Sequence, residues 1–185
     1  LRLDAADCVD FDFFRTLKGF VKSKDPDFWL MGEIIHGDYA RWANPEMLDS
    51  VTNYECWKGL WSSHNDKNYF EIAHSLNRQS GPGGIYRNIT LYNFADNHDV
   101  DRLASKLRDP AHINNLYTLL YTMPGVPSLY YGSEWALKGE RTKHSDAPLR
   151  PCLELKEMMA LDQSLCAHLS KLAAIRAAFP ALQEG

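Results

Sequence analysis

The sequence has few of the features that mark nucleic-acid-binding or membrane proteins. Basic residues are scattered, with no cluster longer than the Lys-Ser-Lys of residues 22–24, and the formal net charge is −4. No apolar stretch approaches the roughly 20 residues that a membrane-spanning helix needs. We therefore expect neither a nucleic acid nor a membrane as a partner.

Cysteine is also scarce. The four cysteines, at positions 8, 56, 152 and 166, are far apart and form no CxxC pair. We expect free thiols in a reducing compartment, so that the protein is cytoplasmic; a single disulfide is the alternative. The histidines at 64, 74, 112, 144 and 168 show no metal-ligand spacing, and we expect no metal site there.

Short apolar runs alternate along the chain with segments of helical period. Strands are predicted over 1–4, 27–33, 49–55, 88–94 and 125–132, and helices over 10–23, 55–62, 68–79, 109–123 and 164–178. No hairpin signal separates the strands, and each is expected to be followed by a helix. This order predicts an α/β fold built from parallel βα units.

Such units form either an open doubly wound sheet or a (β/α)8 barrel. A dinucleotide-binding sheet would need a glycine-rich turn after its first strand, and "LRLDAAD" has none. The first strand instead alternates Leu1 and Leu3 with Arg2 and Asp4, which puts an ion pair on one face. Charged side chains near the carboxyl end of a strand are typical of a catalytic barrel, so we predict a (β/α)8 TIM barrel.

Three of the predicted strand ends carry a carboxylic acid: Asp4, Glu33 and Asp99. Any one of them alone is more simply a helix cap or a solvated loop residue. Three such acids at the carboxyl ends of strands indicate that their side chains converge at one mouth of a barrel. Two carboxyl groups on either side of one bond are what glycoside hydrolysis requires.

The sequence around each acid differs as these roles demand. Arg2 shares a face with Asp4, and a nearby cation keeps a carboxylate ionised, as a nucleophile must be. Glu33 ends the apolar run of residues 28–31, and an apolar wall would favour a protonated acid that can donate. His98 precedes Asp99 and would either orient it or bind a sugar hydroxyl.

Four segments together resemble a known family. "LRLDAAD", "FWLMGEI" and "FADNHD" are similar to three of the four signature regions of the α-amylase superfamily, glycoside hydrolase family 13. "GVPSLYYGSE" resembles the family's segment at the eighth barrel strand, and the segments occur in the family's order. The resemblance runs from residue 1 to about residue 183.

The resemblance implies a role for each residue that matches a motif. Asp4 matches the nucleophile, with Arg2 as the arginine beside it, and Glu33 matches the general acid/base. Asp99 matches the acid that stabilises the transition state, and His98 matches a histidine that contacts the sugar next to the scissile bond.

Two further positions match less specifically. His36 resembles a histidine near the acceptor subsites in some maltodextrin-acting members, the alternative being an ordinary loop residue. Arg102 matches an arginine that commonly follows the "NHD" motif and is expected to be structural. The chain departs from the family at Asp7-Cys8, where a Lys-His pair often contacts the acceptor sugar, and at Ser133, where "YYGDE" would have aspartate.

The family's first signature region and its first three strands have no counterpart here. "PALQEG" resembles the point at which the family's C-terminal β-domain begins. The resemblance therefore implies that residues 1–185 are the C-terminal half of the catalytic barrel, about strands four to eight. We expect such a fragment to self-associate or to pair with the missing half-barrel, and to be nearly inactive alone.

The expected function is retaining hydrolysis of α-1,4-glucosidic bonds in starch-like α-glucans or maltodextrins. The alternatives are transglycosylation on α-glucans, a non-catalytic barrel that serves as a scaffold, and an inactive fragment of the enzyme. No cofactor is needed. Some family members bind calcium, but turns such as "SSHNDKN" lack the regular period of calcium ligands.

Overall fold

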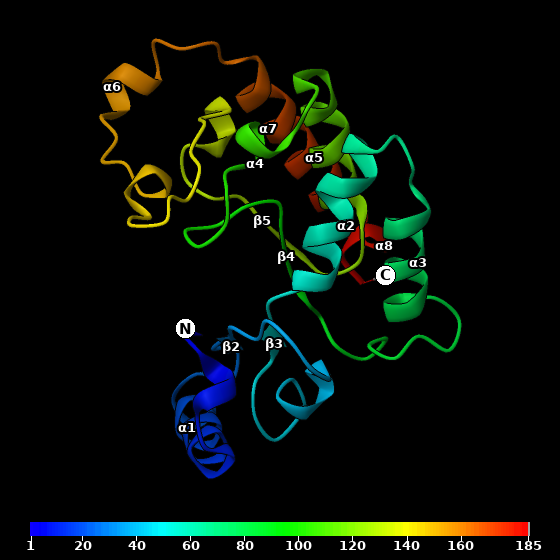
Figure 1. The fold of residues 1–185 in the computed structure, drawn as a ribbon. Coiled ribbons are helices and arrows are strands. Elements are labelled where there is room, and N and C mark those ends of the chain that lie inside the picture. Colours follow the sequence, from blue (N-terminus) through cyan, green and yellow to red (C-terminus); the bar gives the residue numbers. More distant parts are fainter. Residues whose placement is uncertain (185) are drawn as a thin grey trace.

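The computed structural model describes residues 1–184; Gly185, the last residue of the predicted half-barrel, lies outside them. The described residues form five short strands separated mainly by helices (Figure 1). The strands are β1 Arg2–Leu3, β2 Met31–Gly32, β3 Ser50–Val51, β4 Tyr92–Phe94 and β5 Val126–Ser128. The helices are α1 Phe11–Lys24, α2 Tyr54–Asn65, α3 Phe70–Ser80, α4 Leu103–Lys106, α5 Ile113–Thr122, α6 Leu155–Met158, α7 Ser164–Ala178 and α8 Ala181–Glu184.

All the strand pairs are parallel, and neighbours in the sheet are neighbours in the sequence. β2 lies between β1 and β3, with Met31 opposite both Arg2 and Ser50. β4 pairs with β5, and a single parallel bridge from Thr52 to Tyr92 joins the two groups. The carboxyl ends of the strands therefore meet at one edge, as the prediction of parallel βα units requires.

The helix predictions are confirmed closely where capping signals are strong. The side chain of Asp10 accepts a hydrogen bond from the backbone N–H of Asp12 and starts α1, which ends just before Pro26. Asp109 caps a short 3₁₀ turn, Pro110–His112, that leads directly into α5. The last predicted helix, 164–178, is α7.

Two expectations about the strands are wrong. The paired segments contain two or three residues each, fewer than predicted. No α-helix lies between β2 and β3, where the described chain forms only the 3₁₀ turn Tyr39–Arg41. Gly37, in a left-handed conformation, and Pro45 interrupt this segment, so it has no uninterrupted run of helical period.

Two apolar clusters form the core. One packs α2, α5 and α7 against β4, with Leu60, Leu116 and Leu169 buried in it. The other lies between α1 and β2 and includes Phe14 and Leu30. Each cluster includes residues in or beside different strands, so the two clusters support different parts of the sheet.

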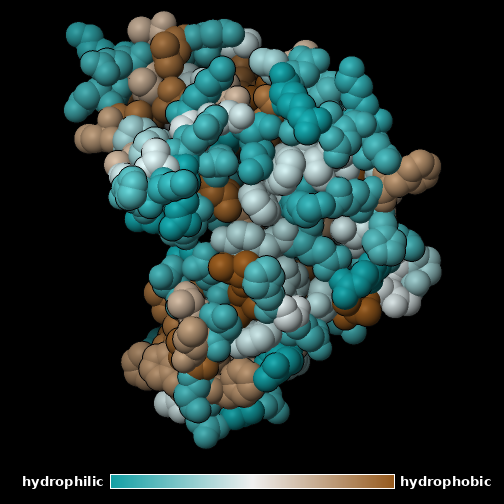
Figure 2. Space-filling model, viewed as in Figure 1, coloured by the Kyte–Doolittle hydropathy of each residue, from teal (hydrophilic) through white to brown (hydrophobic). Residues whose placement is uncertain are grey.

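Apolar side chains also remain exposed at the α1 end of the molecule, where Figure 2 shows them gathered on the surface. Phe13 is 52% exposed and Phe20 is 62% exposed, on one face of α1, and Leu1 is 59% exposed. In the described residues β1 pairs only with β2, so its other edge carries unpaired backbone groups. Within residues 1–184 no helix is long and apolar enough to cross a lipid bilayer.

Gly32 permits a close approach that determines where Glu33 lies. A Cβ atom built on Gly32 would come within 2.8 Å of the Ala6 Cβ and 2.6 Å of the Leu48 Cδ1. We expect Gly32→Ala to lower the free energy of unfolding by about 1–3 kcal/mol, because the added methyl overpacks this contact. Denaturant titration monitored by circular dichroism measures the change.

Gly19→Ala is the matched control for this prediction. A Cβ atom at Gly19, inside α1, meets no atom within 4 Å. Alanine there should raise the free energy of unfolding by about 0.5–1 kcal/mol. Equal effects of the two substitutions would contradict the close packing of Gly32.

Candidate active site

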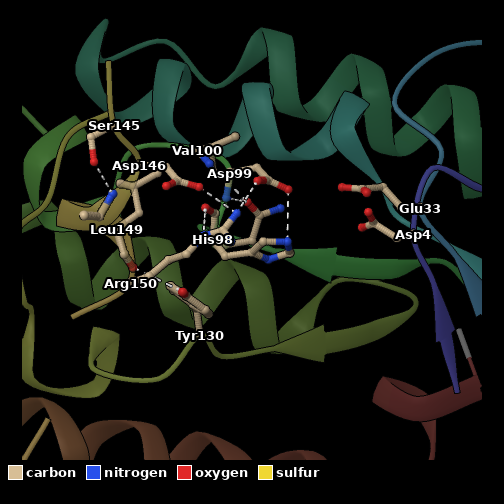
Figure 3. A network of polar contacts seen from close by, with 12 residues as sticks. Asp4, Glu33, His98, Asp99, Val100, Tyr130, Ser145, Asp146, Leu149 and Arg150 are labelled. Atoms are coloured by element: carbon tan, nitrogen blue, oxygen red, sulfur yellow. Dashed lines mark hydrogen bonds and ion pairs between the residues drawn. The ribbon is translucent and has the colours of Figure 1, made fainter. Parts of the chain in front are cut away.

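The three predicted acids lie at the same edge of the sheet. Asp4 follows β1, Glu33 follows β2, and Asp99 lies in the loop after β4. Figure 3 shows the carboxyl groups of Asp4 and Glu33 facing the loop that carries His98 and Asp99. The convergence expected from the ends of parallel strands is therefore present in the structure.

Arg2 joins the first two acids. Its Nη1 lies 2.9 Å from Asp4 Oδ1, and its Nη2 lies 3.0 Å from Glu33 Oε2. The hydrogen bond from Arg2 lowers the pKa of Asp4. Asp4 is exposed to water and Glu33 is buried, so the two carboxyl groups of this bridge have different surroundings.

Glu33 has polar contacts on both oxygens. Its Oε1 accepts a hydrogen bond from the Tyr54 hydroxyl at 3.1 Å, and Asn97 Nδ2 donates to that hydroxyl at 3.2 Å. The expectation that an apolar wall surrounds the Glu33 carboxyl group is therefore wrong. The apolar residues before it, such as Leu30, belong instead to the cluster beneath α1.

Tyr54 is a site residue that the sequence pattern did not reveal. It begins α2 just after β3, so it occupies the same kind of strand-end position as Asp4 and Glu33. Burial raises its pKa to about 12, and the phenol therefore stays protonated and able to donate at neutral pH. Its position at the end of the predicted strand 49–55 was the available signal.

His98 and Asp99 form the other wall of the site. His98 Nε2 lies 3.0 Å from Asp99 Oδ2, and Arg150 Nη2 lies 3.0 Å from Asp99 Oδ1. Arg150 also donates to the backbone carbonyl of His98 at 3.2 Å. Sequence reasoning missed Arg150, because it lies in the long polar segment after β5, where no periodic pattern marks any residue.

Two hollows adjoin these side chains. A cavity of about 130 Å³ is lined by Arg2, His98 and Tyr130, among others, at the carboxyl ends of the strands. A more open groove of about 410 Å³ is lined by His36, Tyr54 and Trp57. His36 thus shares this groove with Tyr54, the hydrogen-bond partner of Glu33, and does not lie among the three acids.

A further hollow, of about 450 Å³, lies elsewhere, between α1 and the turn Tyr39–Arg41, and none of the predicted site residues line it. Arg102 is fully buried and donates to the backbone carbonyls of Tyr131 and Leu149, which confirms its expected structural role. Among residues 1–184 no three His, Cys, Asp or Glu side chains gather as metal ligands, so no residue is assigned to calcium. All four cysteines are free thiols.

Parallel βα units with paired acids at the carboxyl edge are typical of the barrel glycoside hydrolases. The family model "Alpha amylase, catalytic domain" matches residues 6–159. The chain belongs to this family, glycoside hydrolase family 13.

Several known enzymes are similar to the chain. The intracellular maltogenic amylase of Bacillus subtilis is 28% identical over 95% of this chain and 29% of its own length. A cyclomaltodextrinase of Geobacillus thermopakistaniensis is 29% identical over 100% of this chain and 31% of its own. The crystal structure of an Anoxybacillus α-amylase superposes with a TM-score of 0.83 at 27% identity, covering 98% of this chain and 40% of that one. The chain thus spans less than a third of the length of these two curated relatives.

The guanidinium of Arg2 is expected to determine the ionisation of Asp4. Arg2→Gln keeps a polar side chain but removes the positive charge, so the pKa of Asp4 should rise toward its ordinary value. A ¹³C NMR titration of the aspartate carboxyl carbons measures this shift. Since the native pKa is lowered, any stability that the bridge contributes is present above the unfolded-state pKa and is lost as the pH falls through the native one.

Arg15→Gln is the control for this titration. Arg15 pairs with Asp12 on the outer surface of α1. Its removal should leave the titration of Asp4 unchanged. An Asp4 pKa that does not move in Arg2→Gln would show that the bridge is absent in solution.

Proposed function

We propose that the protein hydrolyses α-1,4-glucosidic bonds in maltodextrins or starch-like α-glucans with retention of configuration. The observation that carries this proposal is the contact of one guanidinium, that of Arg2, with both Asp4 and Glu33. A shared guanidinium favours the short carboxyl separation of about 5–5.5 Å that retaining enzymes use over the wider spacing of inverting ones.

In this mechanism Asp4 is the nucleophile and Glu33 is the general acid/base. Asp4 attacks the anomeric carbon while Glu33 gives its proton to the leaving oxygen, which forms a glycosyl–enzyme ester and releases the shortened glucan. Glu33 then takes a proton from water, whose oxygen displaces Asp4 and restores both groups. Asp99 stabilises the positive charge that develops on the sugar ring in both transition states.

The neighbouring side chains support these steps. Arg2 keeps Asp4 ionised for attack, and the Tyr54 hydroxyl orients the Glu33 carboxyl group. His98 donates to a hydroxyl of the sugar beside the scissile bond. His36 contacts the sugar on the leaving-group side, because the groove that it lines adjoins Glu33 through Tyr54.

The relatives guide the choice of substrate and compartment. Their names, maltogenic amylase and cyclomaltodextrinase, refer to α-glucan oligosaccharides, linear or cyclic. We assign the same class of substrate to this protein. The Bacillus subtilis relative is described as intracellular, and together with the free thiols this supports a cytoplasmic location.

Transglycosylation is the second candidate, and the groove lined by His36, Tyr54 and Trp57 is the observation that favours it. Its lining includes the aromatic side chains of Tyr54 and Trp57, on which an acceptor sugar could stack in place of water. Chromatography of the products from maltotriose separates the two reactions, since only transfer yields chains longer than the substrate. The non-catalytic alternative is not favoured, because a scaffold has no need to gather three acids at one edge of the sheet.

We also propose that residues 1–185 supply about strands four to eight of the barrel. The outer edge of β1 and that of β5 have no partner strand among residues 1–184. Phe13 and Phe20 expose the apolar face of α1 beside the first of these edges. Further βα units that pair with both edges would close the barrel and cover this face.

Asp4→Asn in the intact protein tests the nucleophile. Asparagine keeps the shape of the side chain but cannot form the glycosyl ester, so turnover of maltodextrin should fall by on the order of 10³-fold or more. Binding of maltodextrin should be nearly unchanged. A reducing-sugar assay and calorimetric titration measure the two quantities.

Asp12→Asn is the matched control for this test. Asp12 is an exposed acid whose side chain pairs with Arg15 on α1, away from the site. This variant should keep the wild-type turnover. An Asp4→Asn protein that retains most of its activity would show that the nucleophile is another residue.

The isolated polypeptide 1–185 tests the half-barrel. Open strand edges and exposed phenylalanines should make it associate, and its maltodextrin hydrolysis should be at least about a hundredfold below that of the intact protein, because the site lacks part of its wall. Light scattering and the reducing-sugar assay measure both properties. Replacing Phe13 and Phe20 by serine should reduce the association, whereas a monodisperse, fully active wild-type polypeptide would contradict the proposal.

A further inference from the structure

Asp96 is a buried acid that the proposed mechanism does not use. It lies two residues after β4, at the start of the loop that carries His98 and Asp99, and is only 2% exposed. Its Oδ2 accepts a hydrogen bond from the backbone N–H of Leu103 at 2.8 Å, at the far end of the same loop. The Asp96 carboxylate therefore connects the start of this loop to its end.

The same oxygen contacts a second element of the fold. Ser133, in the 3₁₀ turn Ser133–Trp135 after β5, donates its hydroxyl proton to Asp96 Oδ2 at 2.7 Å. Arg102 Nη1 in turn donates to Ser133 Oγ at 3.3 Å. The serine hydroxyl thus links a buried carboxylate to a buried guanidinium.

Arg102 needs such a link because it is fully buried and its other acceptors are uncharged. It donates to the carbonyl oxygens of Tyr131 at 2.8 Å and Leu149 at 3.0 Å, and its guanidinium lies over the rings of Tyr130 and Tyr131. Its Nε is buried without a hydrogen-bond partner in the described chain. A buried cation is costly without a nearby negative charge, and Asp96 supplies one through Ser133.

The bond from Arg102 to Leu149 leads back to the site. Leu149 immediately precedes Arg150, whose guanidinium binds Asp99 Oδ1 at 3.0 Å and the carbonyl oxygen of His98 at 3.2 Å (Figure 3). Tyr130 donates a further hydrogen bond to the Leu149 carbonyl. Asp96 therefore reaches Asp99 by two routes: through its own loop, and through Ser133, Arg102 and Arg150.

We propose that Asp96 is a positioning residue that, together with Ser133 and Arg102, fixes the loop of His98 and Asp99 in its reactive arrangement. The inference rests on the proposed function, which gives Asp99 its role at the sugar ring. Burial raises the pKa of Asp96, whereas the Leu103 N–H, the Ser133 hydroxyl and the charge of Arg102 oppose the rise. These contacts favour the ionised form that the network needs.

The first experiment compares Asp96→Asn with the double variant Asp96→Asn/Ser133→Asp in the intact protein. Asparagine can still accept from the Leu103 N–H but carries no charge. We expect kcat on maltodextrin to fall about tenfold to a hundredfold while KM changes by less than about threefold, since the loss acts on orientation and not on sugar binding. A carboxylate at position 133 would face Arg102 directly, so the double variant should recover most of kcat.

Asp109→Ala is the control for a purely structural effect. It removes the cap of the turn Pro110–His112 and lowers stability without touching the network. Assayed well below its melting temperature, it should keep the wild-type kcat. The proposal is overturned if Asp96→Asn also keeps the wild-type kcat, or if its loss matches the fraction unfolded and the double variant gives no recovery.

A second readout does not depend on catalysis. The imidazole resonances of His98, assigned with a His98→Gln variant, report the position of the loop by NMR. They should shift in Asp96→Asn, return in the double variant and stay in place in Asp109→Ala. If the wild-type protein does not hydrolyse maltodextrin, the proposed function fails, whereas unmoved His98 resonances in Asp96→Asn would overturn the positioning role itself.

Discussion

The candidate site depends on the register between β1 and β2. Arg2 lies opposite Met31 and Leu3 opposite Gly32, so the next residue of each strand brings Asp4 beside Glu33. Two carboxylates this close would repel each other, and Arg2 offsets the repulsion by binding both. A shift of one residue would turn these side chains to the opposite face of the sheet, so the bridge requires this register.

Much of this arrangement is predictable from the sequence because it follows from periodicity. Parallel strands end at one edge, and the acids at their ends can therefore be named from the order of the residues alone. The contacts of Tyr54 and Arg150 are different, since they depend on how α2 and the segment after β5 fold back over the sheet. The error about Glu33 has the same origin: hydrophobicity predicted that its neighbours were buried, but not that they were buried away from its carboxyl group.

The two walls of the site belong to different apolar clusters, and the contact between β3 and β4 aligns them. Asn53, just after β3, donates its backbone N–H to Tyr92 and its side-chain amide to Asn93 Oδ1 and Gln79 Oε1. One residue further on, Tyr54 bonds Glu33 on one wall and is bonded by Asn97 on the other. These hydrogen bonds at the contact between β3 and β4 therefore determine how far the acids of β1 and β2 lie from the loop of Asp99.

Apolar side chains at this contact would stabilise the protein as well as the polar ones or better, because buried polar groups contribute little net free energy once their desolvation is included. Apolar side chains, however, tolerate sliding and rotation at a contact, whereas hydrogen bonds weaken steeply as their angles change. A glycosidase needs its acids held on both sides of one bond to within a fraction of an ångström. Directional contacts at Asn53 and Tyr54 meet that need, and the Asp96 network meets it again on the wall of Asp99, so these buried polar groups lie where orientation matters more than stability.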